Sequence, residues 1–207
     1  MTNSIHAIIF DLGNVLIGWD AHLLYKEYFP NRESVDHFLE EVGFLEWNAK
    51  QDAGRPFAEG VEELSNKFPH HAELIQAYDT HWEKSITEPY SESVEIVRAL
   101  KDAGWALYLL SNFSLEKYKL IEPKHSFLGW FKDKIISGEH GTVKPEEKIF
   151  HILIERIGYK PENCLFIDDS LPNIETAQRL GFKTIHFNSP TQLKTQLLNF
   201  GIKGIQP

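Results

Sequence analysis

The chain has 207 residues, of which 42% are hydrophobic and 13% aromatic, so it can bury a substantial core. This length exceeds one typical domain and falls short of two full ones, which suits a core domain that carries a smaller insertion. The net charge of −9 is spread along the chain and argues against a nucleic acid or an anionic membrane surface as a partner.

Cys164 is the only cysteine, so no intramolecular disulfide is possible and a reducing compartment is expected. Its place in an apolar segment favours a buried structural thiol. The first residues lack a basic region followed by an apolar stretch and a cleavage site, and no segment approaches the ~18 apolar residues of a spanning helix. We therefore expect a cytoplasmic protein with no membrane partner.

The first element is a short run of β-branched and aromatic residues, 8–10, that stops at Asp11 and is followed closely by Gly13 and Asn14. This pattern predicts a buried strand whose carboxylate emerges at the carboxyl end, the edge where open α/β sheets bind ligands. An aspartate that caps a following helix would produce the same local pattern. The later segments favour the first interpretation.

After residue 17 the apolar residues recur at helical spacing until Pro89. Proline and glycine separate the helical segments from one another. The expected helices span residues 21–28, 35–43, 57–68 and 72–86. We therefore predict a small helical domain, residues 18–88, inserted directly after the first strand.

From residue 89 the pattern alternates between helices and strands. Helices are expected over 91–103, 115–124, 146–158 and 173–180, and strands over 105–110, 134–137, 164–167 and 184–187. Such alternation predicts a parallel sheet with right-handed crossovers. The fold class is therefore α/β, with a doubly wound core formed by residues 1–17 and 89–207; residues 201–207 are expected to be a loose end.

Three further apolar runs are followed by polar side chains. The pairs are Ser111-Asn112 after residues 105–110, Lys144-Pro145 after 141–143, and Asp168-Asp169 after 164–167. If these edges converge with Asp11, one pocket holds a nucleophilic carboxylate, donors for phosphate oxygens and acids for a divalent cation. That set matches the needs of phosphoryl transfer through an aspartate.

This order of four motifs, spread over nearly the whole chain, resembles the haloacid dehalogenase superfamily of aspartate-nucleophile hydrolases, in particular its subfamily I. Residues 10–15 and 166–174 are most similar to a branch of bacterial sugar-phosphate phosphatases typified by the α-glucose-1-phosphate phosphatase. The helical insertion then resembles the cap that closes over the pocket and selects substrate in that family.

The resemblance implies a role for each motif residue. Asp11 would be the nucleophile that forms an aspartyl-phosphate, with Ser111 and Lys144 contacting the phosphate as the other catalytic residues. Mg²⁺ would be held by Asp11, the backbone carbonyl of Gly13 and Asp169. Asp168 would be a further ligand or would orient one. Asn112 and Asn14 would lie beside the substrate.

Gly13 departs from the family pattern, because most phosphatases of the superfamily carry a second aspartate two residues after the nucleophile. That aspartate protonates the leaving alkoxide and later activates water, typically a ~10²–10⁴-fold contribution. Glycine can do neither. A sugar 1-phosphate, which leaves as a hemiacetal oxygen, would lose less rate than a simple alkyl phosphate.

Substrate selection is expected to involve residues at the ends of the insertion or near its Gly54 turn. Trp47 and Arg55 are the predicted substrate-binding residues there, with Trp19 and Gln51 as further candidates. The partner would be a small phosphate ester, and the protein a monomer or a weak homodimer.

Two other functions remain open. A 2-haloacid dehalogenase also lacks the second aspartate, but those enzymes need no metal, and the acid pair Asp168-Asp169 argues against one. A phosphate-binding module could retain the pocket and lack turnover. A signalling receiver domain carries its acid pair at the first strand and has no helical insertion, so it fits poorly. The sequence favours a Mg²⁺-dependent phosphatase of small phosphomonoesters, and sugar phosphates are the expected substrates.

Overall fold

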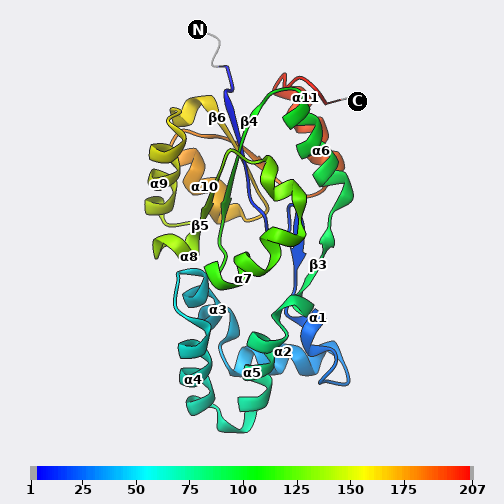
Figure 1. Ribbon diagram of the computed structural model, residues 1–207, viewed down its shortest axis with the longest axis vertical. Coiled ribbons are helices and arrows are strands. Elements are labelled where there is room, and N and C mark those ends of the chain that lie inside the picture. Colours follow the sequence, from blue (N-terminus) through cyan, green and yellow to red (C-terminus); the bar gives the residue numbers. More distant parts are fainter. Residues whose placement is uncertain (1–3, 206–207) are drawn as a thin grey trace.

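A five-stranded parallel sheet forms the centre of the computed structural model, which describes residues 4–205 (Figure 1). In sheet order the strands are β5 (Asp133–Ile136), β4 (Ala106–Ser111), β1 (Ala7–Phe10), β6 (Cys164–Asp168) and β7 (Lys183–His186). Every neighbouring pair is parallel. The predicted parallel sheet is thus confirmed, with the first strand of the chain at its centre.

Helices cover both faces of this sheet, because successive side chains of each strand point to opposite sides. Ile8 and Phe10 belong to one hydrophobic cluster and Ala7 and Ile9 to another. The first cluster includes helices α6 (Ser91–Asp102), α7 (Leu115–Ile121) and α11 (Pro190–Asn199); the second includes α9 (Glu147–Ile157) and α10 (Leu171–Arg179). The core is therefore doubly wound, as expected.

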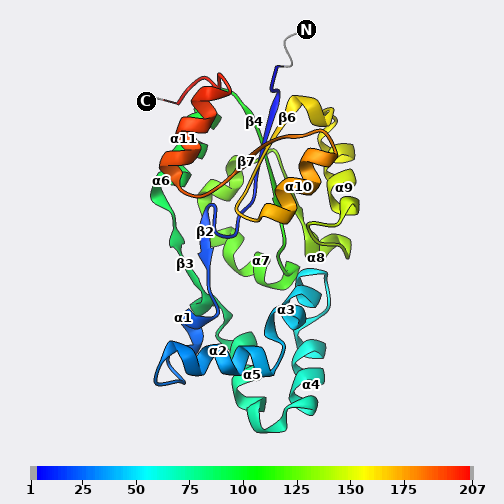
Figure 2. The same cartoon turned by 180° about the vertical axis from the view of Figure 1, so that it is seen from behind.

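A two-stranded antiparallel ladder leads the chain into the helical insertion and back out of it. Strand β2 (Ile17–Trp19) pairs with β3 (Ile86–Pro89). Between them lie α1 (His22–Tyr25), α2 (Arg32–Glu41), α3 (Phe44–Asp52), α4 (Phe57–Lys67), α5 (Ala72–Thr80) and the 3₁₀ turns Pro69–His71 and Trp82–Ser85. Figures 1 and 2 show these helices at the end of the molecule opposite both termini. We call this helical insertion the cap; its boundaries at 18 and 88 stay a prediction.

Several elements of the cap differ from the predicted ones. The helix expected over 72–86 ends at Thr80 and gives way to a 3₁₀ turn and β3. The helix expected over 21–28 covers only His22–Tyr25, and α3 lies where no helix was expected. The ladder is closed by contacts between residues far apart in sequence, such as the 3.0 Å bond from Gly18 N to Thr87 Oγ1. The local spacing of apolar residues gives no information about contacts between residues so far apart in the sequence.

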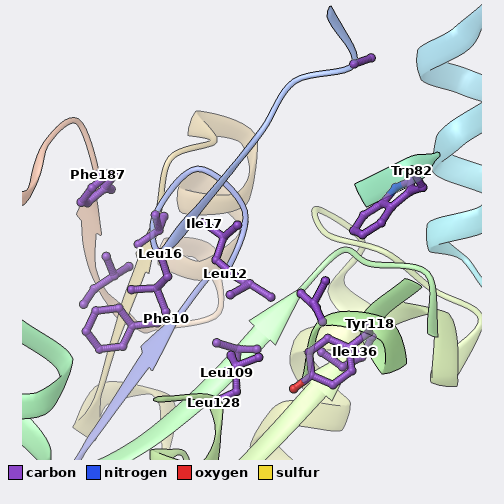
Figure 3. Packing of buried hydrophobic residues seen from close by; sticks show 14 of the residues in the cluster. Phe10, Leu12, Leu16, Ile17, Trp82, Leu109, Tyr118, Leu128, Ile136 and Phe187 are labelled. Atoms are coloured by element: carbon purple, nitrogen blue, oxygen red, sulfur yellow. The ribbon is translucent and has the colours of Figure 1, made fainter. Parts of the chain in front are cut away.

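The hydrophobic core runs without a break from the sheet into the cap. Figure 3 shows this cluster extending from Phe10 and Leu109 in the sheet, through Leu12 and Ile17, to Trp82 in the cap. Such burial stabilises by about 1.5–3 kcal/mol per large apolar side chain. The cap is therefore anchored to the core by packing as well as by the ladder.

Two further expectations concern Cys164 and the last residues. Cys164 is buried in β6, and burial raises the pKa of its thiol to about 12, as suits a structural thiol. The expected loose end at 201–207 is wrong for its described part, because Ile202 is buried and Lys203 O accepts a 2.9 Å bond from Trp105 Nε1; residues 206–207 lie outside the described residues. No helix within residues 4–205 has the length and apolar character needed to cross a membrane.

Candidate active site

Three neighbouring strands end at the same edge of the sheet, and each delivers a polar side chain there. Asp11 follows β1, Ser111 ends β4 and Asp168 ends β6. The backbone N–H of Asp11 donates to Ile167 O at 2.9 Å, which holds the first and last motifs in register. The convergence predicted from the apolar runs is therefore present.

Lys144 connects these strand ends through its buried ammonium. Its Nζ lies 2.9 Å from Asp11 Oδ1 and 2.7 Å from Asp168 Oδ2, and it donates to Leu110 O at 2.9 Å. The side chain is only 1% exposed. A buried cation needs such a complete set of partners, because desolvation otherwise makes its charge very costly.

The segment before Lys144 corrects one prediction, because residues 141–143 do not form a strand. The chain leaves β5, forms the short helix α8 (Ser137–His140) and reaches the lysine through an irregular loop. Asn112 fixes that loop: its Nδ2 donates to Lys144 O at 2.9 Å and its Oδ1 accepts from Lys144 N at 2.7 Å. Asn112, predicted to bind substrate, borders the cavity, but its amide holds the lysine backbone.

The acid pair after β6 is divided between two environments. Asp168 is fully buried, and its Oδ1 accepts from Ser170 N at 2.8 Å and Asn173 Nδ2 at 2.9 Å, so both its oxygens are engaged. Asp169 faces the cavity and accepts a hydrogen bond from the side chain of Asn14. Asp168 is thus placed to orient Lys144, and Asp169 to bind a ligand.

Asn14 is held in a backbone conformation that few residues adopt. Its φ is +54°, in the left-handed region that asparagine tolerates better than most side chains. Its Oδ1 also accepts from Trp19 N at 3.0 Å, so the residue joins the first loop, the cap entrance and Asp169. Like Asp11 and Gly13, it lines the cavity.

Burial shifts the protonation equilibria of this cluster. Burial raises the pKa of Asp11 to about 7, an effect that Lys144 opposes and Asp168 reinforces. Burial also raises the pKa of Asp169, with a further contribution from Asp168. For Lys144, burial disfavours the charged form, but Asp11 and Asp168 outweigh it and the pKa is raised. The lysine is therefore a fixed cation that keeps Asp11 ionisable near neutral pH.

The carboxylates at this edge suit a divalent cation. Asp11, Asp168 and Asp169 each offer a carboxylate oxygen within 4.8 Å of the others. Hard cations such as Mg²⁺ prefer oxygen ligands of this kind. Because the oxygens of Asp168 are bound by Lys144 and the following loop, Asp11 and Asp169 are the carboxylates presented to the cavity, beside Gly13.

Ser111 presents an unusual buried hydroxyl. Its side chain is 1% exposed, and within the part of the chain that the structure describes its Oγ has no hydrogen-bond partner. Burying an unsatisfied hydroxyl is unfavourable. A site that supplies an acceptor to this hydroxyl would compensate for that cost, as a phosphate oxygen would do.

The cavity above these residues has a volume of about 410 Å³ and lies between the core and the cap, with residues of both lining it. Its cap wall consists of Trp19, Asn48, Asp52, Phe57 and Trp82. The loop and helix after β4 contribute Phe113, Ser114 and Lys117. Apart from Trp19, the sequence did not single out these residues. The spacing of Phe44 and Trp47, three residues apart and both buried on α3, was the signal that could have located the helix of Asn48 and Asp52.

Trp47 and Arg55, predicted to bind substrate, are not among the residues that line this cavity. Trp47 is buried in the cap core, where its Nε1 donates to Gly60 O at 2.8 Å. Arg55 donates to Gln51 Oε1 at 2.6 Å and forms an ion pair with Glu63. The hydrogen bonds of both side chains are therefore made within the cap.

Comparisons with known proteins show which family this chain matches. A family model described as haloacid dehalogenase-like hydrolase matches residues 5–181. A phosphoglycolate phosphatase from Aquifex aeolicus is 29% identical over 187 residues, covering 86% of this chain and 82% of the relative. An (S)-2-haloacid dehalogenase from Pseudomonas putida is 27% identical over 196 residues, covering 89% and 85%.

Solved structures show the same fold. A HAD family enzyme from Bacteroides thetaiotaomicron, in complex with magnesium and inorganic phosphate, superposes with a TM-score of 0.67 at 26% identity, covering 89% of this chain and 95% of that one. Some relatives are longer: a drimenol cyclase from Aspergillus calidoustus is 22% identical over 207 residues, and this chain spans 36% of its length.

Proposed function

Because this chain belongs to the haloacid dehalogenase-like hydrolase family, we propose that it is a Mg²⁺-dependent phosphatase that hydrolyses small phosphomonoesters through an aspartyl-phosphate. The observation that carries this proposal is the convergence of Asp11, Lys144 and the acid pair at one sheet edge. Relatives that are phosphatases support it.

Asp11 is the nucleophile in this proposal. A carboxylate oxygen of Asp11 forms a bond to phosphorus while the ester P–O bond breaks, and the departing oxygen takes the electron pair and a proton from water. Water then attacks the acyl-phosphate, releases inorganic phosphate and regenerates the carboxylate. Lys144, 2.9 Å from Asp11 Oδ1, stabilises the ionised nucleophile.

Mg²⁺ would be held by Asp11, Asp169 and the backbone carbonyl of Gly13, with Asp168 orienting Lys144. When bound, the cation neutralises phosphate charge and fixes the orientation of the group being transferred. The relative from Bacteroides thetaiotaomicron that binds magnesium and inorganic phosphate supports this assignment. The unpaired hydroxyl of Ser111 would donate to a phosphate oxygen.

Sugar 1-phosphates are the proposed substrates. Gly13 supplies no acid for the leaving oxygen, so a good leaving group is favoured, and a hemiacetal oxygen leaves more readily than a simple alkoxide. The similarity of residues 10–15 and 166–174 to the α-glucose-1-phosphate phosphatase branch points in the same direction. We further propose a cytoplasmic enzyme, monomeric or weakly dimeric, that binds neither nucleic acid nor membranes, in keeping with its acidic charge and single buried cysteine.

A 2-haloacid dehalogenase is the second candidate, because one relative has that activity and Gly13 is compatible with it. The acid pair Asp168-Asp169, of which Asp169 lines the cavity, argues for a metal-dependent phosphatase instead. A phosphate-binding module without turnover is the third.

The test is phosphate release from a panel of esters, including hexose 1- and 6-phosphates, with Mg²⁺ or with a chelator, beside halide release from 2-chloropropionate. Metal-dependent phosphate release, lost in Asp11→Asn and kept in the exposed control Asp102→Asn, supports the proposal. Halide release would make the protein a dehalogenase. Phosphate binding without turnover of any ester would make it a binding module.

A further inference from the structure

The cap wall of the cavity carries a polar pair opposite the predicted site residues. Asn48 and Asp52 lie one turn apart on α3, and Asn48 Nδ2 donates to Asp52 Oδ2 at 3.0 Å. Asp52 Oδ1 accepts from Ser114 N at 3.0 Å, in the loop that also carries Asn112. The pair is therefore fixed between the cap and the core, and both residues line the cavity.

A chain of hydrogen bonds fixes the orientation of this pair. Trp19 Nε1 donates to Tyr78 Oη at 3.2 Å, and Tyr78 Oη donates to Asn48 Oδ1 at 3.2 Å. Because Asn48 Oδ1 accepts from the tyrosine, the amide must direct its Nδ2 toward Asp52. Such preorganisation is typical of a polar group that selects a ligand.

No cation neutralises Asp52 among residues 4–205. Lys117, which lines the same cavity, is held by Asp79, 2.5 Å from its Oδ1, and lies 4.2 Å from the centre of the Phe57 ring. Arg55 is paired with Glu63. In agreement, burial raises the pKa of Asp52 to about 7, with only the Ser114 N–H opposing.

The wall around the pair is aromatic. Trp19, Phe57 and Trp82 line the cavity beside it. Apolar ring faces combined with a few fixed hydrogen-bonding groups suit a molecule that has both C–H surfaces and hydroxyls. A carboxyl group accepts hydrogen bonds from hydroxyls when ionised, and it repels a second anion.

We propose that Asp52 and Asn48 form a subsite for the hydroxyl groups of an uncharged polyol, and that this subsite discriminates against phosphate esters with a second acidic group. This inference rests on the proposed function, because it concerns the leaving group of the same reaction. It separates this chain from relatives that act on acidic molecules, such as the phosphoglycolate phosphatase and the haloacid dehalogenase.

The first experiment compares kcat/KM for glucose 1-phosphate and 2-phosphoglycolate. Asp52→Asn keeps the shape of the side chain and removes its charge, and Glu62→Gln makes the same change in charge at an exposed residue of α4 outside the cavity. The ratio of kcat/KM, glucose 1-phosphate over 2-phosphoglycolate, should fall roughly 10- to 100-fold in Asp52→Asn, because a hydrogen bond to a charged group is lost and a repulsion is removed. Glu62→Gln should leave the ratio unchanged.

The second experiment measures binding without turnover. In an Asp11→Asn background, tryptophan fluorescence reports ligands in the cavity, because Trp19 and Trp82 line it. Adding Asp52→Asn should weaken glucose 1-phosphate about 10-fold or more and leave inorganic phosphate unchanged. Circular dichroism checks that the variants are folded.

These readouts distinguish the two ideas. If the wild-type protein releases phosphate from no ester, the proposed function fails, and the binding titration alone decides the subsite. If Asp52→Asn changes both substrates equally, or weakens glucose 1-phosphate no more than inorganic phosphate, the subsite assignment is wrong while the phosphatase assignment stands.

Discussion

Replacing Lys144 with methionine tests whether the buried ammonium maintains the site. The substitution retains an unbranched side chain of similar length and removes the charge. It leaves Asp11, 7% exposed, and Asp168, fully buried, without the cation that lies 2.9 and 2.7 Å from their carboxylate oxygens. We expect a large loss of stability as well as a loss of activity.

The magnitude follows from the two ion pairs. At an effective dielectric constant of about 20, each pair contributes about 6 kcal/mol of Coulomb energy before desolvation is subtracted. Removing one partner of a buried pair typically costs about 3–5 kcal/mol, because the remaining charge is uncompensated. For a chain of this size we expect a melting temperature roughly 10 °C lower at pH 8.

The cost should depend on pH. The folded-state pKa of Asp11 is already raised to about 7, and removing Lys144 raises it further. A carboxyl with a raised folded-state pKa destabilises the protein increasingly as pH rises from its unfolded value to its folded value. The variant should therefore lose about 2 kcal/mol less at pH 5.5 than at pH 8.

Urea unfolding at the two pH values, in the absence of metal, measures this difference. Lys148→Met makes the same chemical change at an exposed residue of α9 and should alter stability by less than about 0.5 kcal/mol. An equal loss at both pH values, or a loss below about 1 kcal/mol, would refute the role assigned to the buried ammonium.

Three other variants test separate steps. A Cβ at Gly13 would meet no heavy atom within 4 Å, so Gly13→Asp should fit and speed alkyl phosphate hydrolysis about 10²-fold, with less gain for p-nitrophenyl phosphate. Equal gains in steady-state kinetics would contradict the acid–base argument. Burial raises the pKa of Asp52 from 3.8 to about 7, so the wild-type protein loses stability as pH rises through that range. Relative to wild type, the free energy of unfolding of Asp52→Asn should therefore increase by about 2 kcal/mol between pH 5 and pH 8, as measured by urea titration. A difference that stays constant with pH would refute this. Ser111→Ala removes a hydroxyl with no partner among the described residues, so unfolding should change by less than about 1 kcal/mol while phosphate inhibits about 10-fold more weakly. Unchanged inhibition would remove Ser111 from the phosphate site.

The residues at the carboxyl edge of the sheet could be predicted from the sequence, because each strand and the point where it ends depend on neighbouring residues. Residues 8–10 are apolar and β-branched or aromatic, and the run stops at an acid followed by glycine and asparagine. The run before Asp168 is likewise apolar and stops at an acid, and both runs form strands with the expected carboxylates at their ends. Parallel pairing then places those ends together.

The helices of the cap were harder to predict, because burial in the cap does not follow the hydrophobic pattern of the sequence. On α3, Leu45 is 72% exposed while Gln51 is fully buried, which obscures the amphipathic signal. The helix was missed, and with it Asn48 and Asp52. Trp47 and Arg55 were expected near the substrate because they lie close to the Gly54 turn, but Trp47 Nε1 donates to Gly60 O and Arg55 donates to Gln51 Oε1, both within the cap.

The parallel sheet, the position of Asp11 and of the acid pair, and the presence of a helical insertion could be predicted, because each depends on patterns of residues close together in the chain. Two contacts could not be predicted: Asn112 holds the backbone of Lys144, 32 residues away, and the backbone N–H of Ser114 holds Asp52, 62 residues away. These contacts exist only after the loops are brought together, because the cap and the sheet bury one continuous hydrophobic cluster.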